Sequence, residues 1–188
     1  IVRASFATAL FPDAHRAGGC RLRPLCLGHA VLLQRLASPF FPGGETRPPS
    51  LGDLLLAVWV CSRPWARAVR ETDSRGQRVW LWWKLRARLR HEARDSDAFL
   101  RYMRDSWPAP RIWRDLKRAA TSRGADVLHV LLLTQQAHFG KSLRAALDTP
   151  VAVAVWDHYG WAEEQGALKL WTDTDYQLAE QIDRQEKN

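Results

Sequence analysis

Histidine and cysteine side chains are the residues of this sequence with the clearest capacity for chemistry. Cys26 and His29 stand at the spacing of half a metal site, and Cys20 is the one nearby residue that could be a third ligand. No fourth ligand follows at a matching distance. We therefore interpret the pair as a buried thiol beside a polar histidine at the start of a helix.

Three further histidines, His129, His138 and His158, would approach one another if the helices that carry them pack together. The Glu-x-x-His pattern that supplies metal sites in helix bundles does not accompany them. The sequence Gly-Lys-Ser at 140–142 ends like a phosphate-binding loop but lacks the upstream glycine and the preceding strand. Neither an HExxH motif nor a GxSxG elbow occurs. We therefore expect a chain that is not an enzyme and holds neither a cofactor nor a metal ion.

The segment 125–166, which carries these three histidines, is predicted to form a buried helix, a short helix and a long amphipathic helix. Its apolar residues recur near helical spacing, the first set being Leu128, Leu131, Leu132 and Phe139. Ser caps a helix start, Pro suits a first helical turn, and Gly accepts the left-handed conformation after a helix end. The predicted boundary residues are Asp126, His138, Gly140, Ser142, Pro150 and Gly166.

The rest of the chain alternates apolar helical runs with Pro- and Gly-rich breaks, so we expect an all-α fold. It would be an irregular bundle of about seven to nine helices in one domain, 1–188, with residues 1–20 as a candidate N-terminal appendage. The helix 51–62 is apolar nearly all round and should be central, with Ser50 and Asp53 as its capping box. Other expected segments are a helix after Pro24, a loop at 38–50 pinned by Phe40 and Phe41, helices at 65–71, 78–94, 97–107 (capped at 95–97) and 111–122, an extended stretch at 168–172, and an acidic C-terminal helix within 172–188.

Composition places this chain among ordinary folded proteins, with 188 residues, 46% hydrophobic and 26% charged. Its ten tryptophans imply large contact surfaces, either inside the fold or toward a partner. Three irregularly spaced cysteines argue against a disulfide framework and favour a reducing compartment. No apolar run approaches the ~20 residues that span a bilayer, and we expect a cytoplasmic protein. Because the sequence begins at Ile1 rather than Met, we expect its first residues to be missing.

Charge is divided unevenly along the chain. Residues 1–123 hold 23 of the 28 Lys and Arg and 10 of the 20 Asp and Glu, a net charge of +13, whereas residues 124–188 carry −5. This asymmetry predicts either an anionic partner for the first part or head-to-tail self-association.

The most basic stretch is residues 78–94, RVWLWWKLRARLRHEAR. Tryptophans interleaved with arginines could stack on bases and neutralise phosphates, with Trp80, Trp83, Arg86 and Arg90 as the contacts. The same pattern could lie on an anionic membrane surface. It could equally be an ordinary helix whose tryptophans belong to the core and whose arginines are solvated.

Two stretches resemble small helical morphogenesis proteins of tailed bacteriophages and prophages, in particular the tail assembly chaperone group. Residues 22–40, LRPLCLGHAVLLQRLASPF, lead into an apolar helix through Leu-Arg-Pro-x-x-x-Gly-His. Residues 142–168, SLRAALDTPVAVAVWDHYGWAEEQGAL, have a short turn before a proline and a helix that ends in acidic residues and glycine. Together the two stretches cover about a quarter of the chain.

Members of that group are non-enzymatic proteins that bind the long helical tape-measure protein and help tail-tube subunits to polymerise around it. The resemblance implies an apolar groove lined by Trp156 and Tyr159 that holds an amphipathic helix, in the cytoplasm of a bacterial host cell. Two alternatives stay open. One is a nucleic-acid-binding protein that uses segment 78–94, and the other is a structural virion component that self-assembles through its basic first part and its acidic end.

Overall fold

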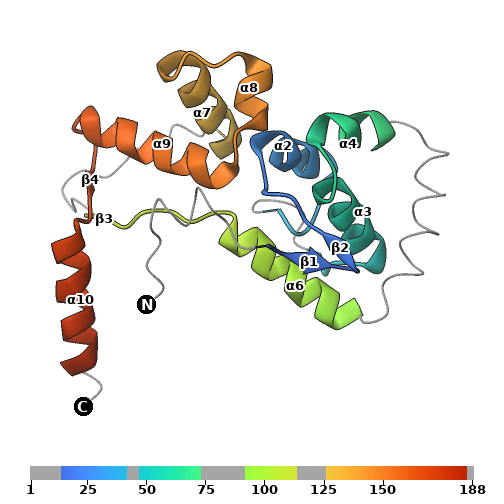
Figure 1. Cartoon of the computed structure of the whole chain (residues 1–188), viewed down its shortest axis with the longest axis horizontal. Helices are drawn as coiled ribbons and strands as arrows, with labels where there is room; N and C mark the ends of the chain where they lie inside the picture. Colours follow the sequence, from blue (N-terminus) through green and yellow to red (C-terminus); the bar gives the residue numbers. More distant parts are fainter. Residues whose placement is uncertain (1–13, 42–46, 73–91, 114–125, 186–188) are drawn as a thin grey trace.

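The structure, a computed structural model, describes residues 14–41, 47–72, 92–113 and 126–185. Within these ranges the protein is all-α, as the sequence predicts: eight α-helices, one π-helical turn and two small antiparallel sheets (Figure 1). Two predicted elements lie partly outside the described residues. They are segment 78–94, of which only residues 92–94 are described, and the helix 111–122, of which only residues 111–113 are described. None of the described helices is long and apolar enough to cross a membrane.

The first part of the chain packs around one buried helix. That helix is α3 (Leu51–Cys61), and every residue from Ala57 to Cys61 is almost fully buried. The predicted capping box is present, since Ser50 and Asp53 exchange hydrogen bonds and Arg47 adds a bidentate ion pair to Asp53. Around it lie α2 (Leu27–Arg35), α4 (Trp65–Thr72), α6 (Glu92–Asp105) and the hairpin of β1 (Arg16–Ala17) and β2 (Cys20–Arg21).

The loop after α2 is held to the core by two aromatic rings, as predicted. Phe40 meets Phe99 of α6 edge to face, with ring centroids 5.1 Å apart, and Phe41 meets Trp107 at 6.0 Å. Both phenylalanines are buried, so the described start of this connection, residues 38–41, is fixed by the packing of its side chains.

The second part consists of α7 (Val127–Leu133), the π turn η1 (Thr134–His138), α8 (Leu143–Asp148) and α9 (Val151–Glu164). The predicted Ser142 cap is confirmed, since its hydroxyl accepts a backbone N–H at the start of α8, and Asp126, the predicted start of the first helix, accepts a backbone N–H at the start of α7. Gly166 has a φ of 67° after α9. There the N–H of Gly166 bonds the oxygen of Glu163 and the N–H of Ala167 bonds that of Ala162, which is a Schellman motif.

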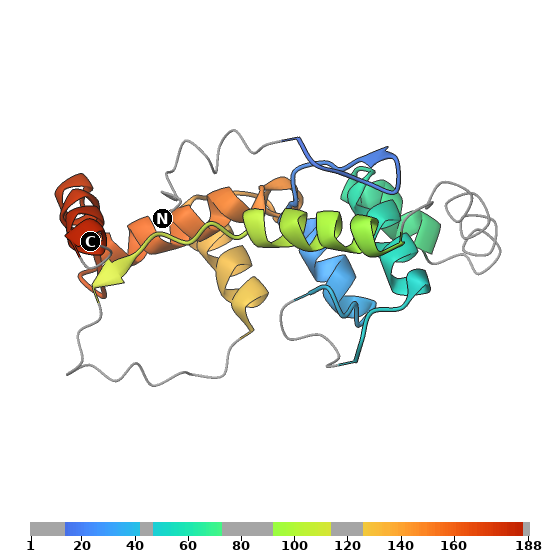
Figure 2. The same ribbon diagram turned by 90° about the horizontal axis from the view of Figure 1, so that it is seen from below.

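Helix α2 joins the two parts, because it packs against α3 and α4 on one side and against α7, α8 and α9 on the other. The segment before α2 pairs with the start of α9: Leu27 N–H bonds the oxygen of Thr149, and Val151 N–H bonds that of Leu25. In Figure 2 the two parts lie end to end along the long axis, and α6 crosses in front of the first part.

Beyond α9 the chain forms β4 (Lys169–Leu170), the predicted extended stretch, and then the acidic helix α10 (Asp173–Gln185). Strand β4 pairs with β3 (Ile112–Trp113). The prediction that residues 112 and 113 begin a helix is therefore wrong, since a partner distant in sequence draws them into a ladder.

The predicted start of α6 is also wrong by several residues. The described part of the helix starts at Glu92, so Asp95 lies inside the helix instead of capping it. The Asp95 carboxylate instead accepts the backbone N–H of Gly18, at 2.9 Å, and so ties α6 to the β1–β2 turn.

Candidate protein-binding surface

The Cys26–His29 pair is a neutral structural contact. His29 is 2% exposed, and its Nε2 lies 2.6 Å from the carbonyl oxygen of Arg63, so Nε2 carries the proton and donates it. Its Nδ1 lies 3.1 Å from the Cys26 Sγ. Burial raises the pKa of the Cys26 thiol to about 11 and lowers the pKa of His29 to about 4. A protonated thiol and a neutral imidazole give no thiolate nucleophile at neutral pH.

This buried imidazole makes stability depend on pH. We expect His29 to lower the free energy of unfolding by about 2 kcal/mol between pH 7 and pH 5. Its pKa is about 4 in the fold and near 6.5 in the unfolded chain, so the unfolded chain binds more protons across this interval. The contribution of neutral His29 to the free energy of unfolding is therefore present above pH 6.5 and is lost as the pH falls. Urea unfolding at the two pH values measures this effect. If the free energy of unfolding of His29→Gln fell by the same amount between pH 7 and pH 5, the pH dependence would come from other groups.

His138 and His158 come together as predicted, around Trp161 of α9, while His129 is exposed elsewhere on α7. The His138 ring stacks on the Trp161 ring with centroids 4.0 Å apart. The His158 ring lies 6.0 Å from Trp161 and 5.9 Å from Tyr159. We call His138, His158, Tyr159 and Trp161 the aromatic cluster. Among the described residues, no group of three or more His, Cys, Asp or Glu could hold a metal ion.

The aromatic cluster contains one histidine that is biased toward its neutral form. Partial burial and the nearby His138 lower the pKa of His158, and its Nδ1 lies 3.0 Å from the Thr134 hydroxyl. His158 is therefore biased toward its neutral form, within a group of rings that have polar edges. Such a surface suits contact with another protein better than the capture of an ion.

Beneath the aromatic cluster a polar network fixes the π turn. The Gln135 side chain is fully buried; its Nε2 donates to the Asp157 carboxylate at 3.0 Å, and its Oε1 accepts from the Lys141 ammonium at 2.5 Å. Lys141 also donates to the Thr149 hydroxyl at 3.2 Å. The network ties η1 to the loop after it, to the end of α8 and to α9. Buried polar groups that find partners in this way rigidify the structure around them.

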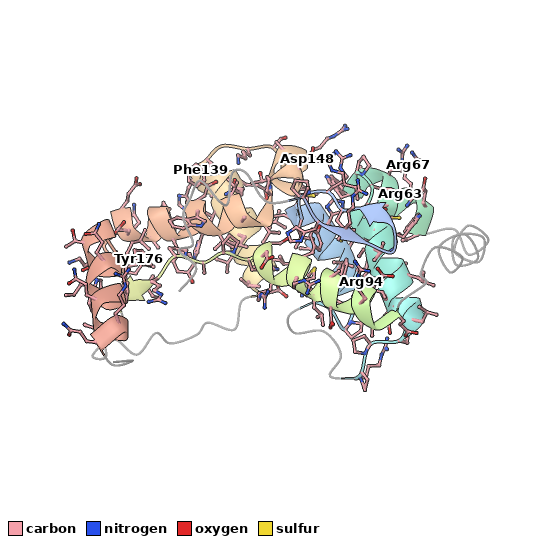
Figure 3. All side chains as sticks on the ribbon, turned by 60° about the horizontal axis from the view of Figure 1, so that its bottom comes forward. Arg63, Arg67, Arg94, Phe139, Asp148 and Tyr176 are labelled. Atoms are coloured by element: carbon pink, nitrogen blue, oxygen red, sulfur yellow. The ribbon has the colours of Figure 1, made fainter. Side chains whose placement is uncertain are left out.

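At the corner where α7 ends, η1 follows and α8 begins, three apolar side chains that are close together in sequence are exposed. Leu133 is 49% exposed, Phe139 46% and Leu143 55%. They end α7, follow η1 and begin α8, and Figure 3 shows Phe139 at this corner. We call these three residues the apolar corner. Phe139 was expected on the buried side of the helix. The π turn adds a residue to the helical turn, so Phe139 is rotated away from that side.

The sequence-predicted groove residues lie on the neighbouring helix. Trp156 and Tyr159 are three residues apart on α9 and are therefore neighbours on its surface; both are half-buried, and Tyr159 packs against the core. The other predicted contacts, Trp80, Trp83, Arg86 and Arg90, lie outside the described residues.

Sequence reasoning missed Trp161, the apolar corner and the polar network. A signal for Trp161 existed, because a tryptophan follows His158 by three residues on the same predicted helix. The network had only a weak signal, a Gln-Gln pair within an apolar helix.

Several arginines of the basic first part are engaged within the fold. Arg67 pairs with Glu71 at 2.6 Å, and the Arg63 guanidinium lies 4.8 Å from the Trp59 ring. Arg47 binds Asp53, and Arg111 lies 4.9 Å from the Trp171 ring. Part of the excess positive charge thus serves internal contacts.

No family model matches this sequence, and no curated protein or solved structure is significantly similar to it.

Proposed function

We propose that this chain is a non-enzymatic assembly factor that binds an amphipathic helix of a protein partner. It would bind its partner in the way that tail assembly chaperones, which it resembles, bind a tape-measure protein. The observation that carries the proposal is the apolar corner, three large apolar side chains exposed within eleven residues and next to the aromatic cluster.

The composition of this surface suits a protein interface. Large apolar and aromatic side chains dominate the affinity of such interfaces, and His and Tyr add polar atoms that can pair across them. Phe139 directly follows His138, whose ring is stacked on Trp161, so the apolar corner and the aromatic cluster adjoin. The polar network holds the backbone between them, which lowers the ordering cost of binding.

The charge of this part of the chain indicates the partner's chemistry. Residues 126–185 contain nine acidic residues and four Lys or Arg, a net charge of −5. The net negative charge of this part of the chain as a whole would attract a helix whose apolar face is flanked by Lys or Arg, while Lys141 and Arg144 are the charged residues next to the apolar corner itself.

The test begins with selection of binding peptides. A library of random peptides about 16 residues long, enough for four helical turns, is selected on the full chain. We expect the enriched peptides to carry apolar residues at i, i+3, i+4 and i+7 with basic flanks. Their affinity is then measured for wild type and for the double variant Phe139→Ser, Leu143→Ser. We expect a loss of tenfold or more, which corresponds to about 1.4 kcal/mol.

A matched control distinguishes the surface from exposed apolar residues in general. Leu100 on α6 is 48% exposed but lies in the first part of the chain, so Leu100→Ser should leave the peptide affinity unchanged. Equal affinities for wild type and the Phe139/Leu143 variant would overturn the proposal. DNA binding that weakens steeply between about 50 and 200 mM salt, without any helical peptide binding, would instead support the nucleic-acid alternative.

A further inference from the structure

One face of the short β3–β4 ladder carries two tryptophans and two basic side chains. Side chains alternate between the faces of a strand, so Arg111 and Trp113 lie on the same side, and so do Lys169 and Trp171. In the antiparallel register Trp113 is opposite Lys169. One step further, the backbone N–H of Trp171 donates to the oxygen of Arg111 at 3.0 Å. We call these four residues the tryptophan ribbon.

The contacts within the tryptophan ribbon cover one of its rings and leave the other exposed. The Arg111 guanidinium lies 4.9 Å from the centroid of the Trp171 ring, and the centroids of the Trp113 and Trp171 rings are 5.4 Å apart. Tyr176 of α10 also meets the Trp171 ring, with centroids 5.4 Å apart. Trp171 is therefore half-buried, whereas Trp113 is 48% exposed.

The exposed ring is held in a fixed orientation by its polar edge. The Trp113 indole N–H donates to the Asp175 carboxylate at 3.3 Å. The same carboxylate accepts the backbone N–H of Thr172 at 2.7 Å and its hydroxyl at 2.8 Å, which anchors it at the start of α10. A ring that is already oriented loses little conformational entropy when a flat ligand stacks on it.

Basic side chains flank this ring. Lys169 is exposed directly across the ladder, and Arg111 is exposed two residues before Trp113 on the same strand side. A guanidinium that lies over an aromatic ring still has N–H donors at its edge, which suit phosphate oxygens. Arg111 comes from the basic first part of the chain, so the ribbon is more basic than residues 126–185 as a whole.

These residue types indicate a ligand that is both flat and anionic. Proteins bind single-stranded nucleic acid with aromatic rings that stack on bases and with basic side chains that neutralise phosphates. We propose that the tryptophan ribbon binds single-stranded nucleic acid, with one base stacked on Trp113 and the adjacent phosphates at Lys169 and Arg111. Bases within a duplex are stacked on each other, so the ribbon selects single strands.

The test uses the full chain and a fluorescein-labelled oligothymidylate about eight nucleotides long. Fluorescence anisotropy gives its affinity, and we expect a dissociation constant of about 10 μM at about 50 mM salt, in the range of binding without sequence preference. Trp113→Ala should weaken binding about tenfold, because the stacked base loses its platform. Trp113→Phe keeps an aromatic face and should lose much less.

The salt dependence tests the phosphate contact separately. Lys169→Gln should lower the slope of log affinity against log salt concentration by about 0.7, the value for one phosphate contact on a single strand. Arg144→Gln removes an equally exposed positive charge on α8 and should leave the slope unchanged. Circular dichroism of each variant establishes that it is folded.

Three results would overturn the proposal. The first is a wild-type dissociation constant weaker than about 1 mM. The second is an unchanged affinity in Trp113→Ala, which would assign binding to another part of the chain, such as segment 78–94. The third is equal affinity for a hairpin duplex, which offers no free base. This inference does not rest on the proposed function, and the variant Phe139→Ser, Leu143→Ser should bind the oligonucleotide like wild type.

Discussion

Replacement of Trp59 by alanine is expected to lower the free energy of unfolding by about 4 kcal/mol. Trp59 is 1% exposed and lies at the centre of the buried run of α3. Removal of its ring would leave a cavity that the surrounding helices can fill only in part. Urea unfolding of the variant at pH 7 measures the loss.

Two comparison variants separate the cavity from other effects. The Trp59 Nε1–H is buried and donates to no described acceptor, so Trp59→Phe removes an unpaired polar group and should cost much less than Trp59→Ala. Leu100→Ala, at a side chain that is 48% exposed, should change stability by less than about 0.5 kcal/mol. A loss below about 1 kcal/mol in Trp59→Ala would show that α3 is not the centre of the core.

Substitution of Gly28 by alanine is expected to destabilise the fold by about 3 kcal/mol. A change from glycine to alanine inside a helix usually has the opposite effect and stabilises the fold. A methyl group at Gly28 in α2 would lie 2.5 Å from the Cγ and Cδ2 atoms of Trp65. Those atoms are close to the backbone of α4, and the Trp65 indole N–H is bound to the Asp148 carboxylate at 2.5 Å. The ring cannot move without loss of that bond between α4 and the end of α8.

Gly160 provides the matched control, because it lies inside α9 and a methyl group there would meet nothing within 4 Å. Gly160→Ala should therefore stabilise the fold by about 0.5 to 1 kcal/mol, from helix propensity alone. Thermal or urea unfolding of the two variants gives the comparison. If Gly28→Ala were also stabilising, the close approach of α2 and α4 would be contradicted.

Features that depend on neighbours in sequence could be predicted from the sequence. The capping box of Ser50 and Asp53, the Ser142 cap and the left-handed Gly166 each follow from side chains or φ preferences within a few residues. The apolar run of α3 was sufficient to predict the central helix, because no face of it is polar.

Features that depend on distant partners could not be predicted. Ile112 and Trp113 form a strand because they pair with Leu170 and Lys169, which lie far along the chain. Asp95 binds Gly18 rather than capping its own helix, and Gly28 is needed only because Trp65 lies against it. Local propensity is a weak prior that such tertiary contacts override.

The candidate surface likewise has features that could be predicted from the sequence and features that could not. The helices that carry His138, His158 and Tyr159 were predicted, and so was the approach of the two histidines. The exposure of Phe139 was not, because it depends on the π turn, which has no signature in the sequence. The bonds of Gln135 to Lys141 and Asp157 likewise depend on the way that η1 packs against α9.

The most direct test of the proposed function is hydrogen exchange of the full chain with and without a selected helical peptide. Exchange at each backbone amide reports whether a bound partner restricts local opening. We predict slower exchange at residues 133–143 and 158–161, where the apolar corner and the aromatic cluster lie, and unchanged exchange along α6. Protection confined to α6, or no protection in residues 133–143, would contradict the proposal that this surface binds the partner.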